Sequence, residues 1–393
     1  METGSDGVCD GGSALCLIHK FGKTVSIPVF SILKVKSDSY LKIVATVFLL
    51  SCISGAGIAF VGDSAYLFHS DYERKIAEYL NSNYFVEGVT NYDERLVQKF
   101  RLNSLRARLK PDTIVLGSSR MMQITQNLLN KKTINLSVSG ASIEDYLALY
   151  HLSKRFNPKR VVIGVDPWVF NAKSGLVGWK TLSNEFLAES KNLGKFMGHA
   201  IEFDQDVWLQ LFNITYIRAS LRSNIKARLA AMANALDRED LIKTLVETPC
   251  SDKDGIRPDG SRIYNLNFAG RSPDQVEESA IQFATSPFQL LSGFQRIDKS
   301  YWSLFRKFVL DVRSKSKVII ALPPFHPSYY KRIVNKVPMV PEVERKIREF
   351  AEDNEILIVG SYDPERVNCD KVDFLDGLHP KTGCISKMFA TIN

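Results

Sequence analysis

Residues 113–120 read TIVLGSSR, a strand-length apolar run that leads directly into a glycine and two serines. The run is β-branched and nearly continuous, which is typical of a strand covered on both faces. Gly117 permits a tight turn where the run ends. The helix-like stretch MMQITQNLL (121–129) follows the turn. These residues therefore predict a strand, a sharp turn and a helix in direct succession.

Four more runs of this kind follow along the chain, and helical stretches alternate with them. The runs are TINLS (133–137), RVVIGV (160–165), KVIIAL (317–322) and EILIVG (355–360). The helical stretches are SIEDYLALYHLSKRF (142–156), YWSLFRKFVLDV (301–312) and PEVERKIREFAEDN (341–354). Ser142 and Asp145 have the spacing of a capping box. Strand–helix alternation implies right-handed crossovers. The predicted fold class is α/β, a doubly wound, flavodoxin-like five-stranded parallel sheet.

An apolar stretch at residues 43–62, IVATVFLLSCISGAGIAFVG, contains no charged side chain. Its length suits a helix that crosses a bilayer, whereas a core helix would usually show a polar stripe. Lysines precede it and acids follow it, so the positive-inside rule predicts a cytoplasmic tail at residues 1–42 and an extracytoplasmic remainder. We expect a single-pass signal anchor in the inner or plasma membrane. Lipoprotein processing at Cys52 is the alternative, because LLSC (49–52) resembles such a site.

Two further regions lie outside the alternating pattern. Residues 63–108 look helical and amphipathic, and we expect them to form a helical stalk or to pack on the domain at 109–393. Residues 172–298 show no clear core strand, and a structureless loop of that size is implausible. We expect a largely helical insertion there, between the third and fourth strands, that serves as a cap or partner surface.

Chemistry-bearing residues follow the first and last strands. Ser119 comes directly after the first, where a helix amino terminus favours a developing anion, although a serine there is also a common helix cap. Asp376 lies three residues before His379, a spacing that lets the carboxylate orient the imidazole, although DG pairs are also common in exposed turns. The carboxyl ends of parallel strands share one sheet edge. We therefore expect Ser119 and His379 to meet.

Four short blocks in this order resemble the GDSL/SGNH hydrolase superfamily: GSSR (117–120), NLSVSGAS (135–142), IGVDPWVFN (163–171) and DGLHP (376–380). The resemblance spans about residues 109–393. It implies Ser119 as nucleophile, His379 as general base and Asp376 as its orienter. It also implies an oxyanion hole from the Ser119 and Gly140 N–H groups and the side chain of Asp166. Gly62-Asp63-Ser64 also reads GDS, but no glycine block follows it at the right distance.

Asp166 departs from the family pattern, which usually has asparagine there. An ionised carboxylate repels an oxyanion rather than donating to it. Three explanations remain open: Asp166 pairs with Arg120, burial keeps Asp166 protonated, or the site is weakened or inactive.

Other residues have two possible roles each. Arg120, Trp168 and His326 are candidates for substrate binding, although apolar packing is the more frequent role for a residue such as Trp168, and a structural turn at His326 is equally open. Cys369 and Cys384 flank the DGLHP block, where a disulfide is possible, but free buried thiols are favoured. We find no metal-ligand pattern and expect no cofactor.

The expected function follows from the resemblance and the membrane anchor. The chain is similar to alginate O-acetylation proteins and to the D-alanyl transfer protein of teichoic acid synthesis. This similarity implies acyl transfer to, or ester hydrolysis on, a cell-envelope polysaccharide, with a membrane-bound acyltransferase as donor partner. The net charge of +8 suits an acidic glycan, while dispersed basic residues argue against nucleic acid. The alternative is a non-catalytic scaffold protein of an envelope polysaccharide complex.

Overall fold

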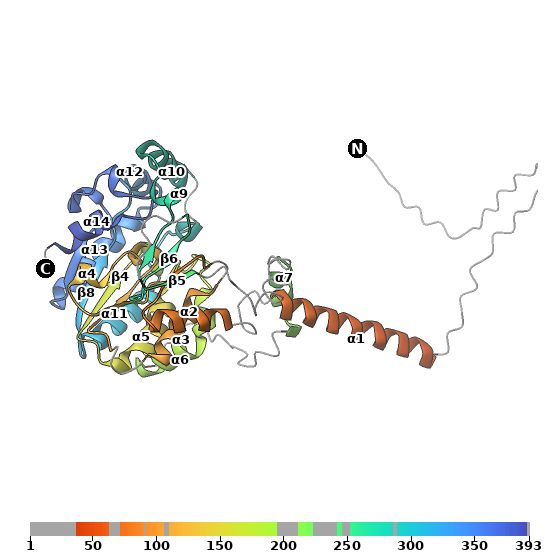
Figure 1. The fold of residues 1–393 in the computed structure, drawn as a ribbon. Helices are drawn as coiled ribbons and strands as arrows, with labels where there is room; N and C mark the ends of the chain where they lie inside the picture. Colours follow the sequence, from red (N-terminus) through yellow and green to blue (C-terminus); the bar gives the residue numbers. More distant parts are fainter. Residues whose placement is uncertain are drawn as a thin grey trace, which may run out of the picture. The chain divides into compact units, whose positions relative to one another are not determined.

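The computed structural model describes residues 37–62, 71–89, 92–105, 110–194, 211–222, 242–245, 252–285 and 289–390. Most of the expected cytoplasmic tail and much of the stretch 220–246 lie outside these ranges. The chain divides into two units, residues 1–52 and 53–393. The helix α1 (Ser37–Gly62) precedes a domain that contains two sheets (Figure 1).

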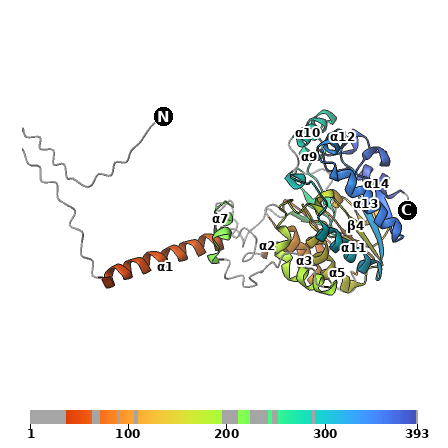
Figure 2. The same ribbon diagram turned by 180° about the vertical axis from the view of Figure 1, so that it is seen from behind.

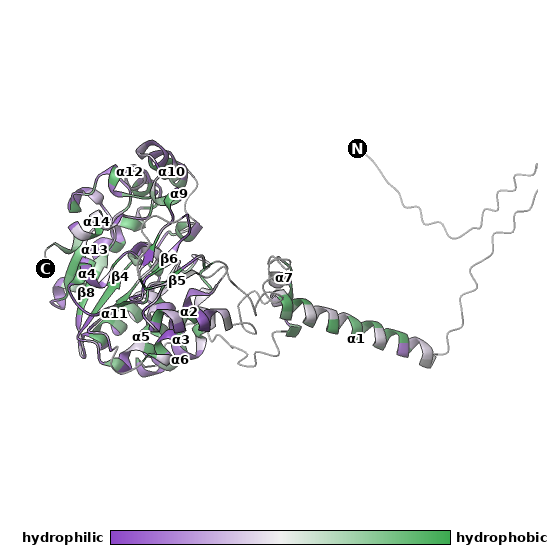
Figure 3. Ribbon diagram, viewed as in Figure 1, coloured by the Kyte–Doolittle hydropathy of each residue, from purple (hydrophilic) through white to green (hydrophobic). Residues whose placement is uncertain are grey.

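Helix α1 is apolar along most of its length. Its segment Ser39–Gly62 has a mean hydropathy of 2.2 and is 6% buried. Among the described residues it is the single helix long and apolar enough to cross a membrane, and Figure 3 shows apolar residues along it. The Thr46 and Ser51 hydroxyls donate to backbone carbonyls one turn earlier, which satisfies their polar groups inside the helix. The helix is therefore consistent with a single-pass membrane anchor.

The larger sheet has five parallel strands in the order β3-β2-β4-β8-β9, which confirms the prediction of a five-stranded parallel sheet. Its strands are β2 (Thr113–Leu116), β3 (Thr133–Asn135), β4 (Arg160–Gly164), β8 (Lys317–Leu322) and β9 (Leu357–Gly360). The chain order reverses between β2 and β4. In sheets of this kind, ligands bind at such a reversal, outside the carboxyl ends of the strands.

Apolar side chains cover both faces of this sheet. Ile114 and Leu116 of β2 belong to the larger core, while Val115 between them belongs to a second core on the opposite face. This alternation is expected of a doubly wound sheet. The larger core contains side chains of α5 (Ile143–Ser153), α11 (Lys299–Arg313) and α13 (Met339–Asp353). The second contains side chains of α4 (Gln126–Leu129) and α14 (Thr382–Phe389). Figure 2 shows α11 and α13 from behind.

The amino terminus of α5 has the predicted capping box. The Ser142 hydroxyl accepts from the Asp145 N–H, and the Asp145 carboxylate accepts from the Ser142 N–H at 2.9 Å. The same carboxylate binds the Arg95 guanidinium at 2.6 Å. Arg95 lies in α3 (Glu94–Ser104), so this ion pair holds α3 against the domain. The described part of residues 63–108 therefore packs on the domain and does not form a separate stalk.

A second, antiparallel sheet joins this amino-terminal segment to the region between β4 and β8. Its order is β5-β1-β6-β7, with β1 (Phe85–Glu87), β5 (Ile242–Thr244), β6 (Gly255–Ile256) and β7 (Arg262–Ile263). The expectation of a largely helical insertion is therefore incomplete, because strands of two or three residues show no periodicity. Further described α-helices are α2 (Asp71–Asn81), α6 (Ser183–Asn192), α7 (Ile214–Arg222), α9 (Leu266–Ala269), α10 (Pro273–Thr285) and α12 (Pro327–Lys336).

A disulfide joins Cys369 to Cys384, with 5.5 Å between their Cα atoms. The sequence favoured free thiols, so that expectation is wrong. The cysteines meet because α14, which contains Cys384, packs beside the turn that contains Cys369. The bridge closes a loop that includes Asp376 and His379, and a disulfide suits an extracytoplasmic domain.

We predict that replacing both bridge cysteines by serine lowers the free energy of unfolding by about 3 kcal/mol, the loop entropy expected for a separation of 15 residues. Thermal unfolding of the full chain in detergent measures this. Cys52→Ser, at the free cysteine of α1, is the matched control and should unfold like the unaltered chain. Reductant should lower the stability of the unaltered chain and leave that of the double variant unchanged. If reductant does not alter the thermal unfolding of the unaltered chain, the prediction is wrong.

Candidate active site

Ser119 occupies the turn that leaves β2. A Cβ at Gly117 would lie 2.6 Å from the Met121 Cγ, so glycine makes room for the tight turn. The Ser118 hydroxyl accepts from the Arg120 N–H at 3.2 Å and caps the 3-10 helix η2 (Ser119–Met121). Ser119 is the first residue of this helix and is partly exposed.

Three side chains form a hydrogen-bonded chain at this edge. The Ser119 Oγ lies 2.9 Å from the His379 Nε2, and the Asp376 carboxylate lies 2.9 Å from the His379 Nδ1. With the carboxylate accepting from Nδ1–H, the Nε2 is left to accept the serine proton. The sequence placed these residues at one sheet edge, and the structure brings them into direct contact.

The Asp376 carboxylate also organises its own loop. It accepts from the backbone N–H groups of Leu378 at 2.7 Å and His379 at 2.8 Å. Burial raises the pKa of Asp376, but attraction to His379 and these hydrogen bonds outweigh burial, so the pKa lies below its ordinary value. The loop closes through a bridge between Phe374 and Pro380. Asp376 is therefore held ionised in a fixed position behind the imidazole.

Arg120, the residue after Ser119, is buried and only 2% exposed. Its Nη1 donates to Asp166 at 2.6 Å, its Nε to the Leu378 carbonyl at 2.9 Å and its Nη2 to the Pro323 carbonyl. The guanidinium also lies over the Phe325 ring, 3.8 Å from its centroid. Arg120 therefore holds together the ends of β2, β4 and β8 and the histidine loop, and it has no exposed surface for a substrate.

The three residues expected to form the oxyanion hole differ in exposure. Gly140 is partly exposed, has φ +57°, and follows Val138, whose N–H donates to the Gly117 carbonyl at 3.0 Å. Its loop therefore lies beside the turn of Ser119. Asp166 is completely buried and is paired with Arg120. Burial raises the pKa of Asp166, and the guanidinium opposes that shift. Pairing of Asp166 with Arg120 was one of the three explanations left open by the sequence. Because the Asp166 carboxyl is completely buried, it does not face the open edge of the sheet.

Trp168 and His326, two candidates for substrate binding, are also buried. Trp168 is 3% exposed, and its Nε1 donates to the Ala141 carbonyl at 3.3 Å. His326 is 0% exposed and caps α12 by accepting from the Ser328 N–H. Burial lowers the pKa of His326 to about 4, so its imidazole is neutral at pH 7. Both positions are structural in this conformation.

Two aromatic side chains that the sequence did not single out lie beside Ser119 and His379. Tyr264 donates its hydroxyl to the Ser119 carbonyl at 3.4 Å, and its ring centroid lies 6.1 Å from that of His379. The Phe268 ring lies 6.3 Å from the same imidazole. Tyr264 comes directly after β7 and Phe268 lies in α9, in a stretch where no local pattern indicates a site. Only the tertiary structure brings them to Ser119.

The comparison with known families concerns nearly the whole chain. One family model matches residues 58–392, and its description is "Protein of unknown function (DUF1574)". No curated protein matches the sequence. The matched range includes both sheets, the disulfide and the chain of Ser119, His379 and Asp376. The protein therefore belongs to the DUF1574 family.

Proposed function

We propose that this protein is an extracytoplasmic, serine-dependent O-acyltransferase or esterase of the GDSL/SGNH type that acts on a cell-envelope polysaccharide. The observation that carries the proposal is the contact of 2.9 Å between the Ser119 Oγ and the His379 Nε2, with Asp376 on the other ring nitrogen. A nucleophile, a base and an orienting carboxylate in this geometry perform acyl transfer in unrelated folds. The partly exposed Ser119 is accessible to an ester substrate.

In the proposed reaction, the Ser119 Oγ attacks the carbonyl carbon of the donor ester while the His379 Nε2 takes the serine proton. The tetrahedral intermediate collapses, the donor alcohol leaves with that proton, and the acyl group remains on Ser119. A sugar hydroxyl, or water in the esterase case, then gives its proton to the His379 Nε2 and attacks the acyl carbon. The second tetrahedral intermediate collapses as the bond from the acyl carbon to the Ser119 Oγ breaks, and the serine oxygen regains the proton from the His379 Nε2. Asp376 stabilises the imidazolium formed in each half of the reaction.

The proposed oxyanion hole consists of the Ser119 and Gly140 N–H groups. An unpaired carboxylate at position 166 would oppose the developing negative charge. The contact of 2.6 Å with Arg120 offsets that charge, which makes the site compatible with an oxyanion. Arg120 is a positioning residue here, because it also holds the Leu378 carbonyl next to His379.

The proposed setting is the outer side of the inner or plasma membrane. Helix α1 is apolar enough to anchor the chain, and the lysines before it favour a cytoplasmic amino terminus. A membrane-bound acyltransferase would supply the acyl group, and no cofactor is needed for this chemistry. A non-catalytic scaffold of an envelope complex is the second candidate, and the observation that favours it is aspartate rather than asparagine at position 166.

We predict that a fluorophosphonate probe labels Ser119 in the folded full-length protein. Ser119→Ala should abolish labelling, and His379→Ala should slow it by a factor of about 10²–10⁴, the range for loss of a general base. Adduct mapping by mass spectrometry measures both. Ser64→Ala is the matched control, because Ser64 lies in the GDS sequence at residues 62–64. An unlabelled Ser119 in folded protein supports the scaffold function instead.

We predict that Arg120→Met destabilises the protein by about 3–5 kcal/mol, because it leaves the buried Asp166 carboxylate without its cation. Asp166→Asn should cost less, since Arg120 keeps its two carbonyl acceptors. The double variant should be more stable than the sum of the single losses implies. Denaturant unfolding of the full chain measures all three. Additive losses would show that the pair is not coupled.

We predict that alkaline phosphatase fused after residue 393 is active in a bacterial host, whereas green fluorescent protein at the same position is dark. This follows from a cytoplasmic amino terminus and one span. A phosphatase activity assay measures the first fusion and a fluorescence assay the second, both on whole cells. The reverse pattern would place the domain in the cytoplasm and exclude an envelope substrate.

A further inference from the structure

Helix α7 packs closely against the last two turns of α1. A Cβ at Gly62 would lie 2.5 Å from the Ser220 carbonyl oxygen. A Cβ at Gly55 would lie 3.1 Å from the Ile217 Cδ1. Ala59, on the same face of α1 between these glycines, is completely buried. Figure 1 and Figure 2 show α7 beside this end of α1. The two helices approach so closely because the α1 residues on this face are small.

This contact determines how deep α7 would lie in a bilayer that α1 spans. Between Gly55 and Gly62 a helix rises about 10 Å, at about 1.5 Å per residue. Gly62 ends both α1 and its apolar segment, so α7 contacts the part of the span within about 10 Å of its end. Amphipathic helices of the membrane interface bury their apolar side to a depth of about 5–10 Å. The position of α7 along α1 therefore coincides with the interfacial layer of one leaflet.

The side of α7 that faces away from α1 is apolar and exposed. Tyr216 and Ser220 are buried and share the side that contacts α1. Ile214 and Leu221 lie on the opposite side, because successive residues of a helix turn by about 100° around its axis. They are 67% and 52% exposed, and Phe212, just before the helix, is 58% exposed. Large apolar side chains that gather on one exposed face indicate an interaction surface, whereas single ones do not.

The charge of α7 suits a phospholipid surface. Its sequence, ITYIRASLR, contains basic residues and no acidic one. Arg218 is exposed and lies between Ile214 and Leu221 on the side that faces away from α1. An arginine in this position can bury its aliphatic stem among lipid chains while its guanidinium reaches the phosphate groups. Apolar and basic side chains on one short helix are typical of helices that lie in the membrane interface.

We propose that α7 is a second membrane contact, whose exposed side chains Phe212, Ile214 and Leu221 insert among the phospholipids of the leaflet in which α1 ends. This inference rests on the membrane setting of the proposed function and not on the chemistry of Ser119. A single span leaves the chain that follows it free to swivel about the helix axis. A second contact beside the span restricts that motion, which favours substrates presented at the membrane surface.

Quenching of a fluorophore by spin-labelled lipids tests this proposal on the full-length protein in vesicles of phosphatidylcholine and phosphatidylglycerol. The fluorophore NBD is attached to a single cysteine, introduced as Ile214→Cys or as Leu221→Cys. We expect a lipid with a nitroxide on the upper part of its acyl chain to lower the NBD emission about twofold at both positions, because quencher and fluorophore then share the interfacial layer. In the parent chain, serine replaces the cysteines outside the disulfide, which are Cys9, Cys16, Cys52 and Cys250.

Two control positions are apolar and as exposed as those of α7. Val372→Cys, at a residue that is 58% exposed outside α1 and α7, should keep its emission. Val47→Cys, at a residue of α1 that is also 58% exposed, should be quenched. Because Ile214 and Leu221 are both exposed, either variant alone keeps the test valid if the other fails to fold.

The outcomes separate this proposal from the proposed function. Quenching at Val47 but at neither α7 position overturns the proposal and favours a protein partner on this side of α7. Absence of quenching at all of these positions also overturns it, together with the membrane setting of the proposed function. Quenching at Ile214 and Leu221, in a protein whose Ser119 is not labelled by fluorophosphonate, supports the membrane contact and rejects only the proposed catalysis.

Discussion

The guanidinium of Arg120 joins the ends of three parallel strands to the loop that carries His379. A buried cation is tolerated only when its donors and its charge are satisfied, and here Asp166, two backbone carbonyls and the Phe325 ring do so. Asp166 follows β4, Pro323 and Phe325 follow β8, and Leu378 lies in the loop of His379. The contacts of Arg120 therefore fix the distance between Ser119 and His379, although neither of these two side chains takes part in them.

This constraint accounts for the aspartate at position 166. If the residue after β4 were chosen only to stabilise an oxyanion, a neutral amide would serve better than a carboxylate. Arg120 changes that choice, because a buried guanidinium without a carboxylate is left with an uncompensated charge. The two residues are therefore understood as a pair, and Asp166 by itself is weak support for an inactive site.

The parallel sheet and the contact of Ser119 with His379 were predictable from sequence because their signals are local. Five apolar runs such as TIVL indicate strands, and Ser119 and His379 each follow one of them, so topology alone places them at one edge. The antiparallel sheet had no such signal. Its β1 pairs with β5 and β6, far along the chain, through strands of two or three residues. Tyr264 had no local signal either. The disulfide was one of two possibilities, because sequence spacing alone does not show whether two cysteines meet.

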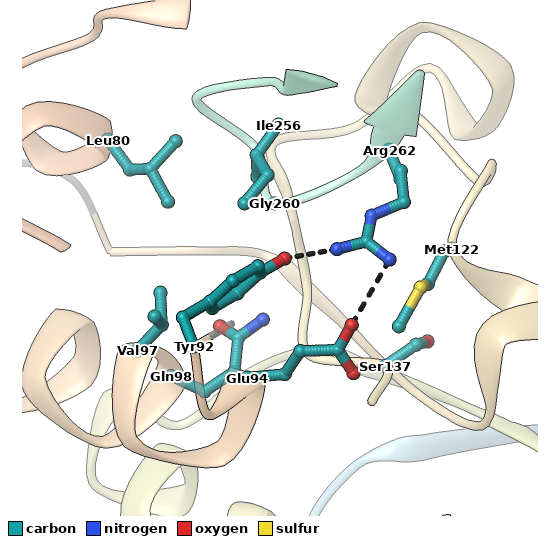
Figure 4. Close-up of a pocket in the computed structure, with 10 residues that line it drawn as sticks. All are labelled: Leu80, Tyr92, Glu94, Val97, Gln98, Met122, Ser137, Ile256, Gly260 and Arg262. Carbon is teal, nitrogen blue, oxygen red and sulfur yellow. Dashed lines mark hydrogen bonds and ion pairs between the residues drawn. The ribbon is translucent and has the colours of Figure 1, made fainter. Parts of the chain in front are cut away.

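The two sheets contribute different parts of the site: the parallel sheet holds the residues proposed to react, and the antiparallel sheet and its neighbours form the walls around them. Of the atoms proposed to react, the Ser119 Oγ comes from the turn after β2, and those of Asp376 and His379 come from the loop that the disulfide closes after β9. The walls next to them come from β7, α3 and the region after β7. Arg262 and Tyr264 bond to the turn of Ser119, and Glu94, which also binds Arg262 (Figure 4), bonds to Ser139 in the loop of Gly140. Substitutions in those walls can alter which ligand is accepted while Ser119, His379 and Asp376 stay in place. In a family defined over residues 58–392, we therefore expect ligand preference to vary with the antiparallel sheet rather than with the catalytic chain.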